Sequence, residues 1–234
     1  EKHFSSAPMT WEELQREVKG KSVRFIRRFV IVQSTGKKRC CDDAAEGGHT
    51  EVTQDANKLR FCSALQPATH VKLLHEAAAE EGRQVSEVQD ELETGGEDFP
   101  DAYRHSPMDQ EDALMCIVVC WHFVWNRPAY QIYYGLLFGL PCAVTSYNRW
   151  PKFCEAVVRR LLIILFSMYF DDATIQDWKS CKGSGQLQVQ QVMSIFGTPF
   201  AEEKRQKMQD EGDFLGLVHK MSRAHVESMS TWVR

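Results

Sequence analysis

The sequence predicts an α+β fold built from two lobes. Hydrophobic residues make up 43% of its 234 residues, which is enough to form an ordinary buried core. Segments with helical spacing are mixed with short runs of β-branched and aromatic residues, and the sequence contains no internal repeat. The glycine pair at residues 95–96 ends an acidic stretch, and we interpret it as a hinge between the two lobes.

Four segments are expected to be helices. The first follows Thr10, and Glu13 three positions later matches a capping box. The third carries Pro151 near its first turn, where proline is tolerated. The expected helices cover residues 11–18, 69–81, 150–162 and 187–196.

Extended segments are expected between these helices, because their β-branched and aromatic content is typical of strands. Residues 114–124 and 129–134 are expected to pair as a hairpin. Residues 163–175 form two apolar runs that are interrupted by two adjacent acids. The other extended segments cover residues 24–33 and 213–219.

Charge is divided unevenly along the chain, although the formal net charge is only −4. Residues 1–39 carry ten Lys and Arg against four acids, and residues 40–112 carry five against eighteen. The basic segment surrounds the apolar run 29–32, which is the pattern of a strand or hairpin that presents cations to phosphate. A solvated basic face is the alternative reading of the same pattern.

Nothing in the sequence indicates secretion or membrane insertion. The longest apolar run, residues 161–170, is too short to span a bilayer, and the first 30 residues lack a signal peptide pattern. We therefore expect an intracellular protein of the cytoplasm or nucleus with no membrane partner. The sequence opens at Glu1 without an initiator Met, so we expect a piece of a longer polypeptide.

The eight cysteines include no C-x-x-C pair, and we expect them to be reduced. Cys116 and Cys120 lie close to His122 in the sequence, which leaves a zinc site open as an alternative to core packing. Core packing is favoured because the two cysteines lie in an apolar run.

Asp171 and Asp172 follow an apolar strand, so their carboxylates are expected to project from its end. Two unpaired carboxylates about 4 Å apart would repel by about 4 kcal/mol at an effective dielectric of 20, and such clusters usually persist because a cation is bound. Magnesium prefers these hard oxygen ligands. Asp98 is the candidate for a further ligand, while a solvated turn or a helix cap is the alternative role for these acids.

The order of several motifs resembles that of reverse transcriptases. Residues 98–103 (Asp-Phe-Pro-Asp-Ala-Tyr) resemble the first catalytic motif, and residues 169–172 (Tyr-Phe-Asp-Asp) resemble the Tyr-x-Asp-Asp motif. The strand and Gly loop at 130–139, the palm motif with its Lys at 197–204 and the primer-grip hairpin at 214–217 follow in the order of the family. The basic fingers strand at residues 37–39 is a looser match. Retrotransposon polymerases look closer than retroviral ones.

The resemblance implies the fingers and palm of a right-hand polymerase, with an antiparallel palm sheet flanked by helices and a thumb that is largely absent. Residues 1–97 would form a fingers-like region, to which residues 106–140 also contribute. Residues 98–105 and 141–220 would form the palm. Residues 221–234 would be the start of a thumb or a truncated tail.

The implied activity is RNA-directed DNA polymerisation, in which deoxynucleotides are added to a primer 3′-hydroxyl. Asp98, Asp171 and Asp172 would be the catalytic residues and would bind two Mg²⁺ ions, with Mn²⁺ as a substitute. One ion would lower the pKa of the primer hydroxyl, and the other would neutralise the leaving pyrophosphate. The implied partners are an RNA or DNA template with a DNA primer, and dNTPs.

The resemblance also implies residues that bind the nucleotide and the primer. Tyr103 would exclude a ribose 2′-hydroxyl. Leu137-Phe138 departs from the family, whose members commonly have Pro followed by a polar or aromatic residue there. The implied nucleotide-binding residues are Tyr103, Lys38, Arg39, Phe138, Gly139 and Lys204, and the implied primer grip is Phe214, Leu215 and Gly216. A decayed polymerase fold that binds nucleic acid or a protein partner is the alternative function, and an unrelated interaction domain is a third.

Overall fold

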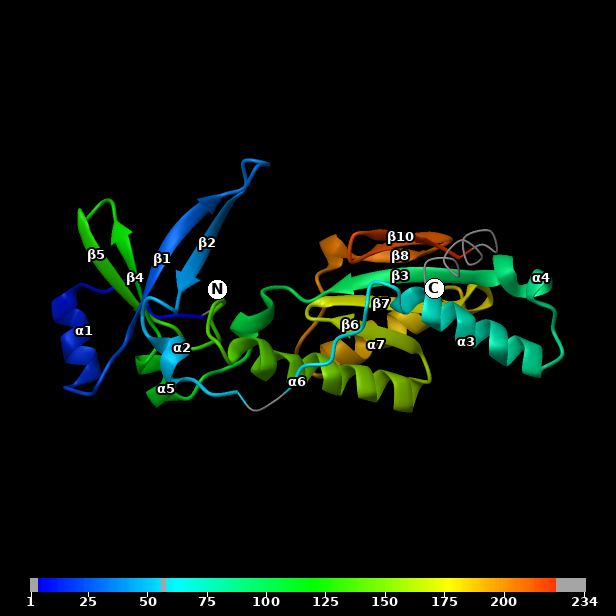
Figure 1. Ribbon diagram of the computed structural model, residues 1–234, viewed down its shortest axis with the longest axis horizontal. Helices are drawn as coiled ribbons and strands as arrows, with labels where there is room; N and C mark the ends of the chain where they lie inside the picture. Colours follow the sequence, from blue (N-terminus) through cyan, green and yellow to red (C-terminus); the bar gives the residue numbers. More distant parts are fainter. Residues whose placement is uncertain (1–3, 56–57, 222–234) are drawn as a thin grey trace. The chain divides into compact units, whose positions relative to one another are not determined.

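The chain forms two compact units, residues 1–59 with 101–148 and residues 60–100 with 149–234. This computed structural model describes residues 4–55 and 58–221 (Figure 1). The thumb or tail predicted at residues 221–234 therefore lies outside the described residues, except for Met221. No helix in the described ranges combines the length and the apolar character needed to cross a membrane.

The first unit contains a four-stranded sheet in the order β2-β1-β4-β5. The pairing is antiparallel except between β1 and β4, which run parallel. Its elements are α1 (Trp11–Val18), β1 (Phe25–Val32), β2 (Lys38–Asp43), α2 (His49–Val52), the 3₁₀ turn η2 (Ala102–His105), α5 (Gln110–Leu114), β4 (Ile117–His122) and β5 (Arg127–Ile132). The predicted hairpin of β4 and β5 is confirmed.

Helix α1 begins at the predicted cap and covers the sheet of the first unit. The Thr10 side chain accepts from the Glu13 N–H (3.3 Å), and the Glu13 carboxylate accepts from the Thr10 N–H (2.8 Å). Leu14 and Val18 belong to a buried cluster that includes Ile117. The capping box predicted from the sequence is therefore confirmed, and it fixes where the apolar face of the helix starts.

Gly135 lies where two chain segments approach too closely for a side chain. A Cβ at this position would collide with the Arg104 carbonyl, 2.8 Å from its carbon atom. We expect Gly135→Ala to lower the free energy of unfolding by about 3 kcal/mol, because backbone cannot move aside as a side chain end can. Urea denaturation would measure it. Gly36→Ala is the control, with open space around its Cβ and an expected cost of about 1 kcal/mol from its φ of +80°.

The second unit is built on an antiparallel sheet in the order β6-β7-β3-β8. A separate hairpin of β9 (Glu211–Phe214) and β10 (Leu217–Lys220) follows it. The other elements are α3 (Gln66–Glu80), α4 (Val85–Val88), η1 (Gln89–Glu91), β3 (Leu92–Asp98), the π-helix η3 (Val158–Leu162), β6 (Leu165–Tyr169), β7 (Asp172–Trp178), η4 (Lys179–Cys181), α7 (Ser184–Ile195), η5 (Glu202–Lys204) and β8 (Gln206–Gln209). Helix α6 (Ala143–Val157) has its first residues in the first unit and continues into the second from residue 149. The predicted α+β class and antiparallel sheet with flanking helices are confirmed.

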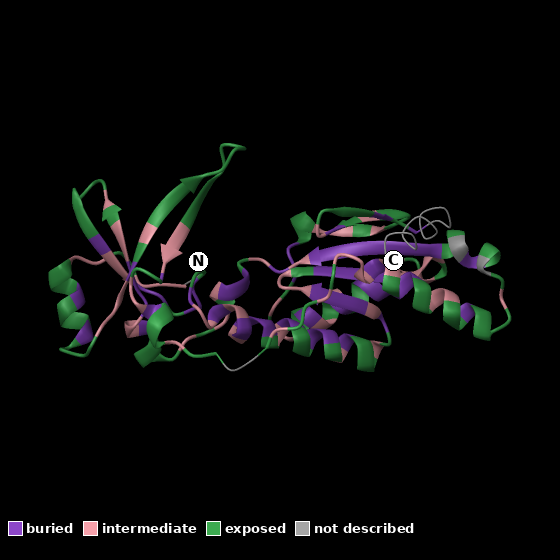
Figure 2. Ribbon diagram, in the orientation of Figure 1, coloured by how far each residue is buried: buried purple, intermediate pink, exposed green. Residues whose placement is uncertain are grey.

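The two faces of this sheet differ in polarity. Phe166 and Ile175 lie opposite each other on one face and belong to a large apolar cluster with Cys154 of α6 and Val189 of α7. On the other face, the side-chain oxygen of Gln176 forms a hydrogen bond with the ring of His70 of α3. Figure 2 shows the buried strands β3, β6 and β7 at the centre of this unit. The apolar face provides the hydrophobic stability, and the polar face is joined by specific hydrogen bonds.

The predicted hinge at residues 95–96 is wrong, because both glycines lie inside β3 and are paired with β7. A Cβ on Gly95 would lie 2.6 Å from the Met208 sulfur and 3.0 Å from the Gln206 carbonyl oxygen. These glycines therefore permit close approach of β8. The predicted fingers boundary at residue 97 also differs from the compact units, since residues 60–97 lie in the second unit.

Two other elements differ from their predicted extent. Helix α6 begins at Ala143 and has Pro151 in its interior, whereas the helix was expected to start at residue 150. The extended segment expected at residues 213–219 is instead two short strands. Leu215 (φ 50°) and Gly216 (φ 79°) form a left-handed turn between them, which ends β9 and reverses the chain.

Candidate active site

The predicted catalytic acids meet at one end of the second unit's sheet. Asp98 is the last residue of β3, and Asp172, the first residue of β7, lies directly opposite it. Asp171 precedes Asp172 in the turn from β6, and its carbonyl accepts from the Phe99 N–H (3.0 Å). Side chains of directly opposed residues in antiparallel strands are close neighbours. The sheet register therefore brings together three acids from two parts of the sequence.

The turn that carries Asp171 is tight and strained. Phe170 adopts a left-handed conformation with φ of 54°, which costs a bulky residue about 1–2 kcal/mol. The Phe61 ring stacks on Phe170, with ring centres 4.6 Å apart, and also contacts Tyr169 at 5.3 Å. Packing against Phe61 helps to hold the strained turn.

Lys204 is the cation beside these acids. The Ala201 N–H donates to the Asp98 carbonyl (2.9 Å), and this bond places η5 next to the end of β3. The Lys204 ammonium then reaches the Asp98 carboxylate, with Nζ 2.5 Å from Oδ1. Lys204, which was predicted to bind nucleotide phosphates, thus lies beside the predicted catalytic acids.

Burial, with a further contribution from neighbouring negative charge, raises the pKa of two of these acids. Loss of solvent around the carboxyl, with the charges of Asp171 and Asp98 beside it, raises the pKa of Asp172 to about 6. Burial is also the main cause of the raised pKa of Asp171, with Asp98 adding to it and Lys204 opposing it. The hydrogen bond to Asp98 raises the pKa of Lys204. The site therefore has more negative charge than its one lysine balances.

A divalent cation suits the chemistry of these donors. Hard carboxylate oxygens with uncompensated charge are the ligands that Mg²⁺ prefers. Within residues 4–55 and 58–221, no group of three or more His, Cys, Asp or Glu side chains is arranged as a ready metal cage. Lys204 engages Asp98 instead, so metal binding would require this ion pair to open.

A second ion pair, between Arg205 and Glu97, lies next to the ion pair between Lys204 and Asp98. The Glu97 carboxylate is fully buried, accepts from Gln190 of α7 (2.6 Å) and lies 3.2 Å from Arg205. Burial raises the pKa of Glu97. Asp98 and Lys204 are the neighbours of this pair in the sequence, so the two ion pairs join β3 to η5 side by side. Sequence analysis missed this role of Glu97 and Arg205, because long-range pairing leaves no local pattern.

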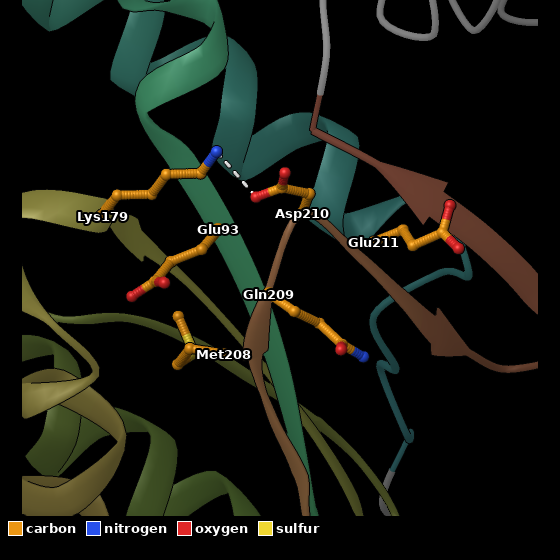
Figure 3. A pocket seen from close by; sticks show the side chains of 6 residues that line it. All are labelled: Glu93, Lys179, Met208, Gln209, Asp210 and Glu211. Carbon is orange, nitrogen blue, oxygen red and sulfur yellow. Dashed lines mark ion pairs between the residues drawn. The ribbon is translucent and has the colours of Figure 1, made fainter.

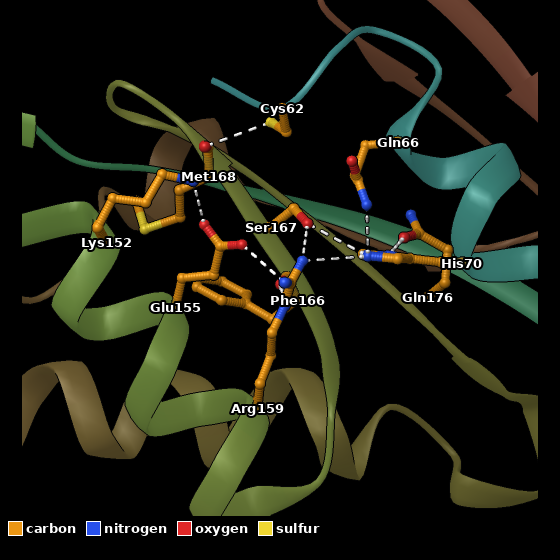
Figure 4. A network of polar contacts seen from close by, with 10 residues as sticks. All are labelled: Cys62, Gln66, His70, Lys152, Glu155, Arg159, Phe166, Ser167, Met168 and Gln176. Atoms are coloured by element: carbon orange, nitrogen blue, oxygen red, sulfur yellow. Dashed lines mark hydrogen bonds and ion pairs between the residues drawn. The ribbon is translucent and has the colours of Figure 1, made fainter. Parts of the chain in front are cut away.

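Side chains cover the open edge of β6, the strand that leads into the turn (Figure 4). The Arg159 Nε donates to the Phe166 carbonyl (2.6 Å), and the Cys62 thiol donates to the Met168 carbonyl (3.3 Å). Arg159 also donates to the Ser167 hydroxyl (2.5 Å). An edge strand normally leaves such groups to solvent. Here Arg159 of η3 and Cys62 support the strand in place of a neighbouring strand.

The same network continues through a buried histidine. His70 contacts the Ser167 hydroxyl (3.2 Å) and the Gln176 side chain (2.5 Å). Burial lowers the pKa of His70 to about 4, so the ring is neutral at physiological pH. On the outer side, Glu155 pairs with Arg159 (2.9 Å) and Lys152 (2.8 Å). The polar network thus connects α3 and α6 to the strands that carry the acids.

A shallow pocket of about 590 Å³ lies elsewhere on the second unit (Figure 3). Its lining includes Lys179, which pairs with Asp210 (2.7 Å), and the buried acid Glu93. The Glu93 Oε1 atom is buried without a hydrogen-bond partner among the described residues. Burial, with a contribution from the Asp177 charge, raises the pKa of Glu93.

This raised pKa predicts a pH-dependent stability difference for Glu93→Gln. The native state holds the Glu93 proton more tightly than the unfolded chain, so the wild type loses stability as pH rises above about 4.3, the usual Glu value. Gln has no such loss. We expect the stability of the variant relative to wild type to be greater at pH 7 than at pH 4 in thermal denaturation. Glu211→Gln, an exposed acid of the same pocket, should follow the wild type, and equal behaviour of both variants would contradict the prediction.

The remaining predicted site residues are divided between the two units. The primer-grip residues Phe214, Leu215 and Gly216 form the β9–β10 turn of the second unit. The predicted nucleotide-binding residues Lys38, Arg39, Tyr103, Phe138 and Gly139 lie in the first unit. Lys38 and Arg39 are exposed on β2, whereas Tyr103 is buried against Tyr147 and Phe138, with ring centres 4.7 and 4.6 Å away. A Cβ on Gly139 would lie 2.5 Å from the Asp42 carbonyl oxygen, which explains the glycine.

The cysteines of the suggested zinc alternative are not grouped as ligands in the described residues. Cys116 is buried, and burial raises the pKa of its thiol to about 12. Cys120 lies on β4, opposite Ala129 of β5. All eight cysteines are free thiols.

Solved structures of reverse transcriptases match this fold. A foamy viral protease–reverse transcriptase in complex with double-stranded DNA matches with a TM-score of 0.61 and 12% identity, over 89% of this chain and 32% of its own. The prototype foamy virus protease–reverse transcriptase matches in a selenomethionine-labelled CSH mutant (TM-score 0.60, 12% identity, 90% and 26% coverage) and in its native form (0.57, 10%, 84% and 23%).

The fold of this chain is therefore that of a reverse transcriptase, with the mixed α and β structure of polymerase fingers and palm. The chain spans about a quarter to a third of the length of these proteins. No protein-family model and no curated protein matches the sequence.

Proposed function

We propose that this chain is the fingers-and-palm part of an RNA-directed DNA polymerase from a retroelement, which adds deoxynucleotides to a primer 3′-hydroxyl. One observation carries the proposal: Asp98 and Asp172 oppose each other at the end of the sheet, with Asp171 in the adjoining turn. Polymerisation of nucleotides requires carboxylates grouped in this way, and the reverse transcriptase fold supplies the matching framework.

Asp98, Asp171 and Asp172 would hold two Mg²⁺ ions, for which Mn²⁺ could substitute. The bound ions would supply Lewis-acid chemistry, activating the primer hydroxyl and stabilising charge on the leaving pyrophosphate. Lys204 would release Asp98 when the ions bind and would then be free to meet the nucleotide phosphates. The strained turn at Phe170 and the Phe61 ring on it would keep the Asp171 carboxylate in a fixed position.

The residues of the first unit would handle the nucleotide. Tyr103 would exclude a 2′-hydroxyl and so select dNTPs, and the exposed cations Lys38 and Arg39 would meet the triphosphate. Phe138 and Gly139 would lie against the new base pair. A nucleic acid ligand is supported by the solved neighbour that holds double-stranded DNA, and we propose that the β9–β10 turn at Phe214, Leu215 and Gly216 contacts the primer.

The test is extension of a labelled DNA primer on an RNA template, with Mg²⁺ or with EDTA, and with dNTPs or rNTPs supplied separately. We expect extension that needs Mg²⁺ and prefers dNTPs, and we expect Asp171→Asn to abolish it. Binding of the primer–template by both proteins should be measured by fluorescence anisotropy in parallel. Tyr103→Ala should increase rNTP use if this ring selects the sugar.

Failure of extension with intact primer–template binding would favour the alternative of a non-catalytic polymerase fold. The ion pair between Lys204 and Asp98 is the observation that favours this alternative, because it places a cation on a proposed metal ligand. Mn²⁺ binding, followed by electron paramagnetic resonance, separates the two: a catalytic site binds the ion, whereas a decayed site does not.

A further inference from the structure

Two hairpins of the first unit, β1–β2 and β4–β5, share a sheet over only part of their length. The parallel β1–β4 ladder ends where Arg27 lies opposite Val119. Beyond this point, β1 remains paired with β2 as far as Val32, and β4 remains paired with β5 as far as His122. Figure 1 shows the two hairpins diverging beyond the shared ladder. Each hairpin therefore has a strand edge directed toward the other.

The backbone groups of β1 alternate between its two neighbours. The Ile117 N–H donates to the Arg24 carbonyl (3.1 Å), so even-numbered residues of this segment face β4. The Gln33 N–H donates to a carbonyl across the β1–β2 turn (2.9 Å), so odd-numbered residues face β2. Val30 and Val32 consequently direct their N–H and C=O groups toward β4, beyond the end of the ladder. In the described part of the chain, no strand pairs with them on this side.

The side chains around these open edges are apolar and exposed. Val30 and Val32 are 55% and 61% exposed on β1, and Trp121 on β4 is 52% exposed. Phe29 and Ile31 on the opposite face of β1 are also exposed. Long exposed apolar strand edges invite pairing with another chain, and proteins normally block them with charge, proline or a covering element. Residues 29–33 contain neither Pro nor a charged side chain.

The positive charge of the β1–β2 hairpin indicates the charge of a segment that would pair with the open edge of β1. Residues 25–41 contain five basic side chains and no acidic one. Arg28 pairs with Asp42, and Arg27 pairs with Asp43 and Glu46, at the base of the hairpin. The basic residues 37–39 at the tip are exposed, and no carboxylate among the described residues pairs with them. The tip is therefore positive beside an apolar strand edge.

We propose that this surface binds an extended segment of a protein partner by strand addition, with the segment pairing to the Val30–Val32 edge of β1. The main-chain groups of the segment would satisfy the open N–H and C=O groups, and its apolar side chains would cover the exposed residues of β1 and β4. Acidic residues beside the apolar stretch would meet the basic tip. This interaction does not require polymerase activity, but it shares Lys38 and Arg39 with the proposed triphosphate contact, so the peptide and a nucleotide would compete for the tip.

The first test uses the unmodified chain and the synthetic peptide Glu-Glu-Val-Thr-Val-Thr-Val-Glu-Glu as the probe. Amide hydrogen exchange should be fast at Val30 and Val32 in the free protein and slower at their β2-paired neighbours Phe29 and Ile31. Adding the peptide should slow exchange at Val30 and Val32 at least tenfold. The same peptide with N-methyl groups on alternate amides keeps its charge but cannot form the ladder, so it should give no protection.

The second test uses substitutions on the open edge. Val30→Pro removes one donor that β2 does not use, and it should weaken peptide binding at least tenfold. Val30→Thr keeps the donor and the strand propensity, and it should change binding less than twofold. Circular dichroism of both variants checks that the sheet is retained, and the exchange experiment decides the question if Val30→Pro does not fold.

Four results would overturn the proposal. The peptide could fail to bind at millimolar concentration, or the N-methylated peptide could protect the same amides. An oligonucleotide could protect them where the peptide does not, which would make the edge a nucleic acid surface. Protection that rises with protein concentration alone, together with a dimer in light scattering, would instead assign the edge to a second copy of this chain.

Discussion

Asp98→Asn is expected to reduce primer extension by about 100- to 1,000-fold while leaving the fold intact. Asn keeps the shape of the side chain but removes the charge that would hold a metal ion and that now pairs with Lys204. Loss of one charged group at a phosphoryl-transfer centre has effects of this size. The measurement is single-turnover extension at saturating primer–template, combined with Mn²⁺ binding by electron paramagnetic resonance.

Stability distinguishes the metal role of Asp98 from a structural role. The half-exposed ion pair with Lys204 contributes about 0.5 kcal/mol, and relief of repulsion with Asp171 and Asp172 offsets part of this. We therefore expect Asp98→Asn to unfold within about 2 °C of the wild type. Asp90→Asn, an exposed acid of the same unit, should leave activity and Mn²⁺ binding unchanged. Loss of activity with unchanged Mn²⁺ binding would show that Asp98 is not a metal ligand.

Local patterns in the sequence predicted most of the elements around this site. The β6–β7 hairpin followed from two apolar runs interrupted by Asp171 and Asp172, and α1 followed from the capping box at Thr10. These predictions succeeded because side-chain periodicity and caps act within a few residues. The grouping of Asp98 with the later acids came from the resemblance in motif order, since no local pattern brings distant residues together.

The failed predictions involve contacts that no local pattern records. Two glycines at residues 95–96 are typical of a flexible link, yet β8 packs so closely on β3 that a Cβ on Gly95 would meet the Met208 sulfur. The start of α6 at Ala143 was missed because proline usually lies near the start of a helix, whereas Pro151 lies in the interior of this one. Arg159 was assigned no role, although it covers the edge of β6 from η3, the helical segment just before this strand. Tertiary packing decided each of these cases.

Arg159→Ala is expected to lower the free energy of unfolding by about 2 kcal/mol. The substitution removes charged hydrogen bonds to the Phe166 carbonyl and the Ser167 hydroxyl, as well as an ion pair with Glu155. The Arg159 side chain is 39% exposed, so water replaces part of the loss, and Lys152 still pairs with Glu155. Thermal denaturation should show a melting temperature lower by about 4–8 °C.

The matched control is Arg160→Ala, which removes the same side chain from the next position, where it is exposed. We expect this control to unfold within about 2 °C of the wild type. Because β6 leads directly into the turn that carries Asp171, the loss of its edge support should also increase amide exchange at Met168 and Tyr169 in Arg159→Ala. If Arg159→Ala and Arg160→Ala unfold alike and leave this exchange unchanged, β6 is held by β7 and the apolar core alone. A selective effect of Arg159→Ala would show that a side chain replaces the missing strand at the edge of the catalytic sheet.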